Sequence, residues 1–505
     1  MTNPLFDALF APHEENEATL LIHPDGSTTS YRDFLVTVAR IANALVGTGL
    51  QPGDRLAMQV TKSPQALATY AACVQSGIVL LPLNTAYTAT EVDYFVGDAE
   101  PGLVLCDPSQ EDTLRPVAAA HGAQLMTLDA AGKGSFSDAF SSQPAQFETR
   151  ERGPDDLASI LYTSGTTGRS KGAMQTHNNL LSNAKALVDA WQFTSDDVLL
   201  HALPIFHTHG LFVASNITFL AGGSMIFLPA FDADRMLGFL PSATTMMGVP
   251  TFYTRLLQDE RLNRDLVSHI RLFVSGSAPL LAETHTEFEA RTGHRILERY
   301  GMTETSMITS NPYGRERKPG AVGMALPGIE IRISDPETGK PMADGDIGVV
   351  EVRGPNVFKG YWRMPEKTKE EFRDDGFFIT GDLGYIDSEG YLILVGRGKD
   401  LIISGGYNIY PKELELLLDE QDGVLESAVI GVPHPDFGEG VVGVLVPAKG
   451  ATIDTDAILA DLKPKVARFK QPKVLYIVDA LPRNTMGKVQ KNLLREDYKD
   501  TFAKA

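Results

Sequence analysis

The sequence predicts an α/β protein with a large N-terminal part and a small C-terminal one. Helical patterns alternate with short apolar strands over the first 150 residues, and the pattern resumes after Asp155. This alternation is typical of parallel or mixed sheets covered by helices. Near residue 320 the pattern changes to strands with a two-residue period, and the last hundred residues form a smaller α/β unit.

The N-terminal elements follow from apolar periodicity. We expect a helix over 31–49 and strands over 55–60 and 79–82. The most apolar stretch, 66–83, is interrupted by Gly77 and Pro82. It therefore predicts a helix running into a buried strand rather than a membrane span. A further apolar run at Leu272, Phe273 and Val274 ends in SGSAPL, where a strand would open into a ligand-facing loop.

The C-terminal elements have a different character. Ile329, Ile331 and Ile333 alternate with polar residues, which predicts a strand with one wet face in an antiparallel sheet or a small barrel-like part. The stretch 396–406, GRGKDLIISGG, is a plausible domain boundary. Beyond it we expect a helix from Pro411, strands at 426–432 and 440–446, and a helix at 455–466.

Composition narrows the functional classes. The chain has 505 residues, of which 43% are hydrophobic, and a formal net charge of -19. Such an acidic chain argues against nucleic acid or an anionic membrane as the main partner, but it leaves anionic small molecules open. Cys73 and Cys106 belong to no Cys/His cluster, which argues against a zinc site and fits a reducing compartment. The N-terminus has no signal-peptide pattern, so we expect a cytoplasmic protein.

A glycine-rich loop, YTSGTTGRSKG, spans 162–172. Its glycines let the backbone approach a ligand, its hydroxyls donate to phosphate oxygens, and Arg169 and Lys171 neutralise charge. A solvated linker is the alternative, although linkers rarely follow an apolar strand such as 158–162 directly. The loop is not a Walker A motif, because Ser170 precedes Lys171 and Gly172 follows it.

Four later motifs occur in one order with this loop: YGMTE at 300–304, TGDLG at 380–384, GRGKDLIISGGYN at 396–408 and PRNTMGK at 482–488. The set resembles the adenylate-forming superfamily of acyl-CoA synthetases, peptide-synthetase adenylation domains and firefly-type luciferases. The resemblance covers the chain from about residue 160 onward. It implies an N-terminal domain, 1–398, that binds ATP and the acid, and a mobile C-terminal lid domain, 399–505.

The resemblance also implies a binding site for ATP and Mg²⁺. Thr163 and Glu304 would hold the metal, and a carboxylate oxygen is a ligand that Mg²⁺ prefers. Asp382 would accept hydrogen bonds from the ribose hydroxyls. The residues implied for ATP are Thr163, Ser164, Gly165, Thr166, Thr167, Gly168, Lys171, Ser277, Ala278, Pro279, Glu298, Tyr300, Gly301, Met302, Thr303, Asp382 and Arg397.

Lys488 would be the adenylation lysine. Its ammonium would stabilise the charge that builds while the carboxylate attacks the α-phosphorus and pyrophosphate leaves. The lid would then rotate about Lys399, a position where many members carry Asp, and the loop of Ser404, Gly405 and Gly406 would admit the pantetheine arm of coenzyme A. Because no carrier-protein segment follows Lys488, free coenzyme A is the expected acceptor. In related synthetases this lysine is acetylated, which implies an acetyltransferase and a deacetylase as partners.

Three residues address the choice of acid. His207, in PIFHTHG, matches the gate histidine of the superfamily, and it would act beside the reacting carboxylate. Arg255, in GVPTFYTRLL, and Arg299, in LERYGMTE, have contexts that resemble those of malonyl-CoA synthetases. There the matching residues hold the distal carboxylate, as a buried carboxylate requires. The alternative for Arg255 is an exposed helix face, and for Arg299 a pairing with Glu298 or another acid.

The expected function is therefore the ATP-dependent, AMP-forming ligation of malonate to coenzyme A. Methylmalonate, another short-chain acid or an aryl acid is an alternative substrate. An enzyme that loads a carrier protein and a non-catalytic nucleotide-binding protein are further alternatives. The intact Thr163, Lys171, Glu304, Asp382 and Lys488 argue against the last.

Overall fold

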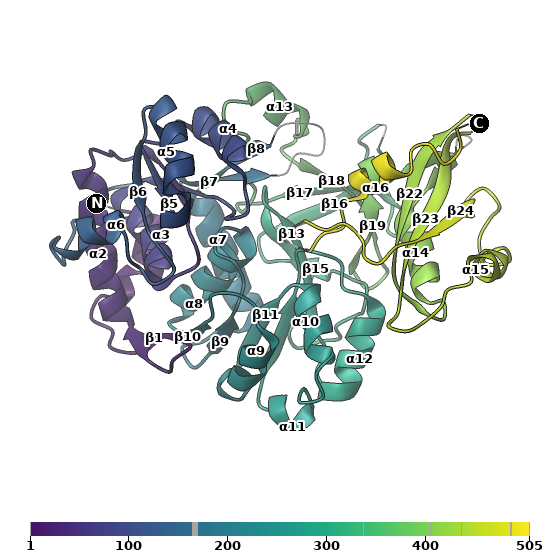
Figure 1. The fold of residues 1–505 in the computed structure, drawn as a ribbon, viewed down its shortest axis with the longest axis horizontal. Helices are drawn as coiled ribbons and strands as arrows, with labels where there is room; N and C mark the ends of the chain where they lie inside the picture. The colour runs from purple at the N-terminus through teal and green to yellow at the C-terminus, as the bar shows by residue number, and fades with distance from the viewer. Residues whose placement is uncertain are drawn as a thin grey trace. The chain divides into compact units, whose positions relative to one another are not determined.

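The computed structural model describes residues 2–163, 170–336, 338–404, 407–435, 437–484 and 487–503. The chain divides into two compact units (Figure 1). The first comprises Met1–Glu330 and Val352–Phe378, and the second comprises Ile331–Glu351 and Ile379–Ala505. The boundary of a moving lid between residues 398 and 399 stays a prediction.

Two sheets form the framework of the first unit. In the nine-stranded sheet the order is β15-β14-β13-β12-β11-β9-β10-β1-β2. Its strands are β1 (Thr19–Ile22), β2 (Thr28–Ser30), β9 (Val198–His201), β10 (Ser224–Phe227), β11 (Thr245–Gly248), β12 (Leu272–Ser275), β13 (Leu297–Met302), β14 (Ser306–Ser310) and β15 (Met324–Ala325). The six-stranded sheet, ordered β6-β5-β3-β4-β7-β8, contains β3 (Arg55–Gln59), β4 (Val79–Pro82), β5 (Leu103–Cys106), β6 (Gln124–Thr127), β7 (Leu157–Thr163) and β8 (Lys171–Thr176).

Helices connect and cover these strands (Figure 1). They are α1 (Pro4–Leu9), α2 (Tyr31–Gly47), α3 (Pro64–Ser76), α4 (Ala89–Ala99), α5 (Glu111–Ala120), α6 (Ser135–Ser141), α7 (His177–Trp191), α8 (Asn216–Ala221), α9 (Ala233–Phe239), α10 (Pro250–Leu257), α11 (Arg264–Val267), α12 (Ala282–Thr292) and α13 (Pro365–Glu370). The parallel pairing of β9, β10, β11, β12 and β13 confirms the predicted α/β class. Such pairing brings the carboxyl ends of these strands to one edge of the sheet.

Local sequence explains how the predicted elements begin and end. The Ser30 side chain caps α2 by accepting from the Asp33 N–H, and the helix ends at Gly47, two residues before the predicted end. Helix α3 begins with Pro64 at its first position and ends before Gly77, whose φ is 75°. Glycine adopts this left-handed conformation without strain, so the chain turns there into the buried strand β4. The stretch 66–83 is thus a helix followed by a strand, as predicted.

The second unit holds two smaller sheets. The region predicted to be a small barrel-like part forms a four-stranded sheet in the order β16-β17-β18-β19. Its strands are β16 (Glu330–Ser334), β17 (Gly348–Arg353), β18 (Phe378–Ile386) and β19 (Leu392–Arg397). The five-stranded sheet contains β20 (Ile402–Ser404), β21 (Tyr407–Ile409), β22 (Val424–His434), β23 (Gly438–Pro447) and β24 (Val474–Ile477), with α14 (Pro411–Asp419), α15 (Thr455–Leu462) and α16 (Lys491–Asp497).

The predicted helix at Pro411 and the two predicted strands that follow it are confirmed. The next helix was predicted to reach residue 466 but ends at Leu462. The β16 strand is confirmed, yet its polar residue Ser334 is buried, so the alternation of a wet and a dry face fails at its end.

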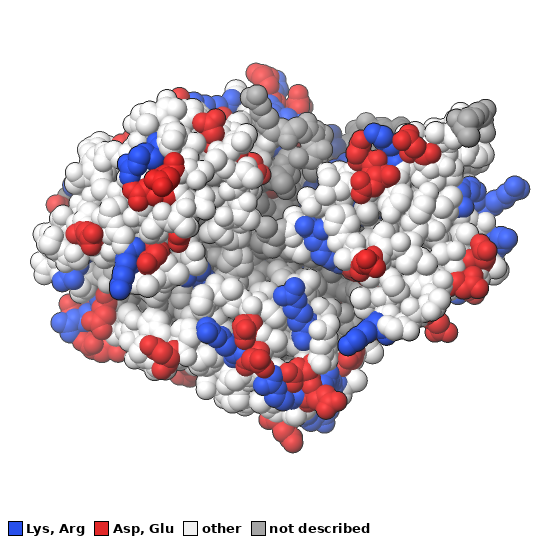
Figure 2. Space-filling view, viewed as in Figure 1, with Lys and Arg blue, Asp and Glu red and all other residues white. Residues whose placement is uncertain are grey.

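On the described part of the face in Figure 2, basic and acidic side chains are interspersed. Both cysteines are buried and free. Among the described residues, no helix is long and apolar enough to cross a membrane.

Candidate active site

Arg299 is the central residue of the candidate acid pocket. It lies on β13, level with the carboxyl end of β12, because Ser275 pairs with Glu298 in the parallel register. Its side chain is buried, with a relative exposure of 4%. Its Nε and Nη2 atoms have no hydrogen-bond partner among the residues that the structure describes. Burial lowers the pKa of Arg299 to about 9, so the guanidinium is still charged at neutral pH.

A buried cation without a carboxylate is costly, so this arrangement requires an explanation. The backbone beside it leaves room for the guanidinium because residue 276 is glycine: a Cβ built on Gly276 would lie 2.4 Å from Cζ of Arg299. The predicted alternative, a hydrogen bond to Glu298, accounts for neither open nitrogen. The geometry suits an anionic ligand with two oxygens, since a guanidinium binds a carboxylate through paired N–H groups.

Burial, together with the charge of this guanidinium, lowers the pKa values of two histidines, His207 and His209. Burial, and then the charge of Arg299, lowers the pKa of His207 to about 4. The same two causes hold the pKa of His209 well below its usual range. The backbone N–H of His209 donates to Nδ1 of His207 at 3.3 Å, which assigns the ring proton of His207 to Nε2. Both imidazoles are therefore neutral, and His207 is a hydrogen-bond donor rather than a second cation.

His209 was missing from the predicted site, although it lies in the same PIFHTHG motif as His207. It opens a π-helical turn, η3 (His209–Ser215), and its Nδ1 lies 3.3 Å from Oγ of Ser277. Ser277 has a φ of 72°, in the left-handed region that is uncommon outside glycine. Such strain at the carboxyl end of β12 is typical of a ligand-binding loop. Ala278 and Pro279, predicted beside the nucleotide, continue this loop.

Arg255 stands apart from this pocket in its exposure. It lies on α10 with an exposed side chain, and its guanidinium is 5.7 Å from the centroid of the Phe231 ring. The structure thus gives the surface position that the alternative described. Its predicted contact with the distal carboxylate stays a prediction.

The phosphate region is described only at its two ends. Ser164, Gly165, Thr166, Thr167 and Gly168 lie outside the described residues. Thr163 ends β7 and Lys171 begins β8, and Oγ1 of Thr163 donates to the Lys171 carbonyl at 3.5 Å. The hairpin therefore holds the predicted lysine directly beside the predicted metal ligand.

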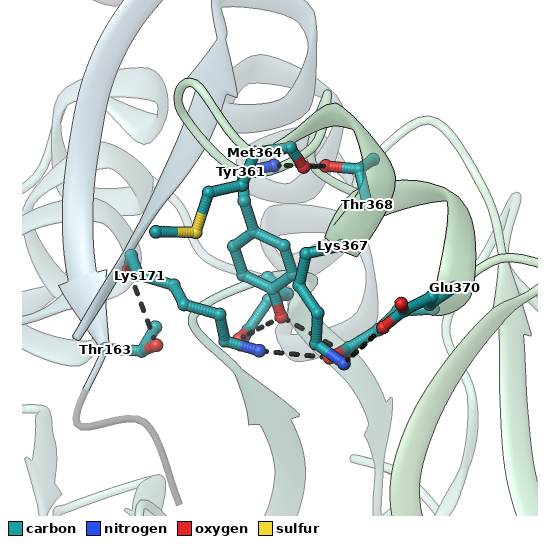
Figure 3. A network of polar contacts seen from close by, with 9 residues as sticks. Thr163, Lys171, Tyr361, Met364, Lys367, Thr368 and Glu370 are labelled. Atoms are coloured by element: carbon teal, nitrogen blue, oxygen red, sulfur yellow. Dashed lines mark hydrogen bonds and ion pairs between the residues drawn. The ribbon is translucent and has the colours of Figure 1, made fainter. Parts of the chain in front are cut away.

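A polar network surrounds Lys171 and Tyr361 (Figure 3) and includes Glu304. The Lys171 ammonium lies 3.0 Å from Oε1 of Glu371 and 4.1 Å from the centroid of the Tyr361 ring. The Tyr361 hydroxyl lies 3.0 Å from Oε1 of Glu304 and 3.2 Å from Oε2 of Glu371. The sequence prediction missed Tyr361 and Glu371, because their place depends on a pairing of 360–362 with β8.

The other nucleotide residues of the prediction lie on β13 and the turn after it. Tyr300 and Glu298 are buried, and Glu298 accepts from the Gly320 N–H at 3.4 Å and lies 3.6 Å from His285. A Cβ on Gly301 would lie 2.0 Å from the Ser306 carbonyl oxygen, so close packing explains this glycine. The Met302 N–H donates to Thr305. The Thr303 carbonyl accepts from Gln175 at 2.6 Å.

The predicted residues of the second unit form a separate cluster. Asp382 on β18 and Arg397 on β19 are register partners, and their side chains form an ion pair of 2.6 Å. Desolvation, and then the charge of Arg397, lowers the pKa of Lys488 to about 8, although its side chain keeps solvent contact. Lys399 and Asp400 also act on Lys488 electrostatically. Gly487 has a φ of 77°, which accords with the backbone freedom expected beside Lys488.

Ser404, the first residue of the predicted coenzyme A loop, is buried at the end of β20. Gly405 and Gly406 lie outside the described residues. Lys399 lies in a short 3₁₀ turn between β19 and β20, and burial lowers its pKa. The predicted hinge thus occupies a connection between two strands.

The described side chains fit Mg²⁺ only when it is bound together with a nucleotide. Among the described residues, no group of three or more His, Cys, Asp or Glu side chains could hold a metal ion by itself. Mg²⁺ that arrives with a nucleotide needs only one or two protein oxygens besides phosphate and water. Buried Glu304 with Thr163 fits that lesser requirement.

Comparison with known proteins identifies the class. The model of the AMP-binding enzyme family matches residues 10–362, and the model of the AMP-binding enzyme C-terminal domain matches residues 413–488. The chain belongs to this family of AMP-binding enzymes.

Several individual proteins are similar to this chain over nearly its whole length. ATP-bound MatB from Rhodopseudomonas palustris is 60% identical, with a TM-score of 0.98 over 99% of this chain and 100% of the other. A malonate–CoA ligase from Arabidopsis thaliana is 33% identical over 98% of this chain and 89% of its own length. A feruloyl-CoA synthase from an Amycolatopsis species is 36% identical over 98% of both.

Proposed function

We propose that this protein is an AMP-forming malonate–CoA ligase. It would convert malonate and ATP to malonyl-adenylate and pyrophosphate, and then pass the malonyl group to coenzyme A with release of AMP. Family membership, the likeness to ATP-bound MatB and the likeness to malonate–CoA ligases support the reaction class.

The observation that carries the choice of acid is the open guanidinium of Arg299. It is buried, charged and without a partner for two of its nitrogens among the described residues. A dicarboxylate supplies the missing anion at its distal end, while its other carboxylate reacts. His207, neutral and protonated on Nε2, can donate to a carboxylate oxygen without adding a second positive charge.

The first half-reaction places new negative charge on the phosphates. Mg²⁺, when bound with ATP by Glu304 and Thr163, would offset part of that charge. Lys488 would offset another part through its ammonium, and a pKa near 8 keeps most of it protonated at neutral pH. Asp382, fixed by its pair with Arg397, would accept from the ribose hydroxyls.

The second half-reaction would use the other face of the lid. We place the moving domain at residues 399–505, its hinge at Lys399 and the coenzyme A passage at Ser404, Gly405 and Gly406. Lys488→Ala should then abolish adenylate formation but spare thioester formation from supplied acyl-adenylate. Equal loss of both half-reactions contradicts this domain alternation.

Lys488 is also a candidate for acetylation, because its side chain is exposed and its lowered pKa increases the neutral, nucleophilic fraction. Mass spectrometry of the protein from deacetylase-deficient cells should find the modified lysine, and its absence there counts against the proposal. The cytoplasmic location stays a prediction.

An aryl acid is the second candidate, because a feruloyl-CoA synthase is as similar to this chain as the malonate–CoA ligases are. The two candidates differ in what they ask of Arg299. A dicarboxylate pairs with the buried guanidinium, whereas an aryl monocarboxylate leaves it without a counter-ion.

A substrate panel measured by pyrophosphate release, with and without coenzyme A, separates these candidates. Malonate, methylmalonate, acetate, butyrate and ferulate suffice. We expect malonate to have the largest kcat/KM. Arg299→Met should reduce kcat/KM for malonate by a factor equivalent to about 3–5 kcal/mol, because one partner of a buried ion pair is lost. The parallel variant Arg255→Met tests the second predicted arginine, and undiminished malonate turnover in both variants overturns the dicarboxylate assignment.

A further inference from the structure

The contacts of Lys171 with Glu371 and Tyr361 fix the position of its ammonium. Lys171 and Glu371 are 200 residues apart in sequence, yet their side chains pair at 3.0 Å and are both largely buried, with exposures of 18% and 22%. Ion pairs shielded to this degree are screened less by salt than surface pairs, and their geometry is better fixed. The network therefore restricts where the Lys171 ammonium can point.

The backbone explains why these residues meet. The Met174 N–H donates to the Gly360 carbonyl at 3.0 Å, and the Trp362 N–H donates to the Gly172 carbonyl at 2.7 Å. The segment 360–362 thus lies against β8 as an added antiparallel partner. This pairing carries the Tyr361 ring to the Lys171 side chain. Helix α13, which follows, ends at Glu370, and the next residue, Glu371, brings its carboxylate to the same ammonium.

The Tyr361 ring and hydroxyl have separate contacts. The ring face lies 4.1 Å from the Lys171 nitrogen, a cation–π distance. A hydroxyl has one hydrogen, and two carboxylate oxygens lie within 3.2 Å of it. The two carboxylates therefore share one donor.

Glu371 is a stable anion in this setting. Although burial raises the pKa of its carboxyl, the bonds from Lys171 and Lys367 lower it below the usual range overall. Lys367 lies 3.1 Å from Glu371 and 3.0 Å from Glu370 (Figure 3). Glu371 thus stays charged at neutral pH and can orient a cation continuously.

We infer that Glu371 and Tyr361 are positioning residues for ATP. Glu371 and the Tyr361 ring hold the Lys171 ammonium in place at the first residue of β8, and the Tyr361 hydroxyl ties the same arrangement to Glu304, the proposed metal ligand. Neither residue needs to touch the nucleotide. The inference rests on the proposed roles of Lys171 and Glu304 toward phosphate and Mg²⁺.

The experiment measures KM for ATP with saturating acid and coenzyme A, and the calorimetric Kd of α,β-methylene-ATP with Mg²⁺. Glu371→Gln keeps the size of the side chain and removes its charge. We expect both constants to rise about fivefold, while KM for the acid stays the same, because a part-buried pair contributes about 1 kcal/mol. A fall in either constant shows that Glu371 competes with phosphate for Lys171, which overturns the inference.

Glu370→Gln is the matched control. Glu370 is the preceding residue, its side chain is 66% exposed, and it pairs with Lys367. Glu370 carries the same charge at the same end of α13 but does not pair with Lys171, so nucleotide binding should be unchanged in this variant. An equal effect of the two glutamine variants reports only a loss of negative charge near the site and also overturns the inference.

Two tyrosine variants separate the ring from the hydroxyl. Tyr361→Phe keeps the ring and should raise the Mg²⁺ concentration for half-maximal activity about threefold, since Glu304 loses a donor worth about 1 kcal/mol or less. Tyr361→Leu should in addition raise KM for ATP, because the cation–π contact is lost. Identical behaviour of the two variants contradicts the separate roles. Thermal unfolding of each variant identifies any that fails to fold.

A double-mutant cycle with Lys171→Met distinguishes this inference from the proposed function. If Lys171 binds phosphate and Glu371 acts through it, Lys171→Met weakens nucleotide binding and Glu371→Gln adds nothing further. If Lys171→Met leaves Kd unchanged, the phosphate role fails. If Lys171→Met weakens binding and Glu371→Gln still adds its full effect, the phosphate role holds and the positioning inference fails.

Discussion

At the two ends of the parallel strands in the nine-stranded sheet, an arginine side chain has opposite surroundings. At the amino end Arg271, directly before β12, donates from Nε and Nη2 to both oxygens of Asp197 at 2.7 and 2.6 Å, and from Nη1 to the Trp191 carbonyl at 2.9 Å. At the carboxyl end Arg299 has two nitrogens without a partner among the described residues.

The residues around Arg271 and those around Arg299 differ in the same way. Asp197 has an exposure of 3% and accepts further bonds from Thr244 and from the Thr194 N–H, so the amino end is a saturated cluster. The carboxyl end has the neutral His207 and His209 and the strained Ser277. A guanidinium whose carboxylate is supplied by the protein stabilises the fold. A guanidinium that has no carboxylate partner from the described residues is suited to bind a ligand that carries a carboxylate.

The largest expected difference is in stability. Arg271→Met leaves the buried Asp197 carboxylate without its cation and should lower the free energy of unfolding by about 3 kcal/mol. Arg299→Met removes an unpaired buried charge and should leave that free energy unchanged or slightly higher. Urea unfolding followed by circular dichroism measures both. Similar losses in the two variants show that Arg299 also has a structural partner, and the contrast between the two ends disappears.

The neutral His207 at the carboxyl end should make stability depend on pH. The pKa of His207 in the folded protein is about 4, below its value of about 6.5 in the unfolded chain. Below about pH 6.5, His207 binds a proton in the unfolded chain but not in the folded protein. The free energy of unfolding therefore falls with falling pH down to about pH 4. His207→Gln should reduce that slope by one proton, or about 1.4 kcal/mol per pH unit.

Arg299→Met offers the control for this titration, because its charge is the second cause of the low pKa. In that variant, NMR titration of the His207 ring should give a higher pKa than in the wild type. An unchanged pKa means that burial alone accounts for the shift and that the two side chains do not interact.

The smallest expected effect comes from filling the space beside the Arg299 guanidinium. In Gly276→Ala the new Cβ would lie 2.4 Å from Cζ of Arg299, so the flexible end of that side chain must shift. We expect KM for malonate to rise about fivefold, or about 1 kcal/mol, with a change in unfolding free energy below about 1 kcal/mol. Steady-state kinetics with malonate and butyrate checks this, since butyrate lacks the distal carboxylate and should be insensitive.

Much of the fold could be predicted because its signals are local. The Ser30 cap, the Gly77 turn and the apolar runs of β4 and β12 act over a few residues, and the predicted elements there agree with the structure. The end of α15 was misplaced, although a local signal for it exists, because Pro464 cannot continue a helix and lies two residues after Leu462. No comparable local signal predicts that two nitrogens of Arg299 have no hydrogen-bond partner among the described residues.

The sequence by itself determined the family, through motifs whose residues lie close together along the chain: the glycine-rich loop, YGMTE, TGDLG and PRNTMGK. The sequence also predicted that both Arg255 and Arg299 bind the second carboxylate, with no reason to prefer one over the other. Only the tertiary structure distinguished them, by exposing Arg255 and burying Arg299 with open nitrogens. Burial and pairing depend on strands and helices that meet from distant parts of the chain, as Lys171 and Glu371 do, and no local pattern encodes such meetings.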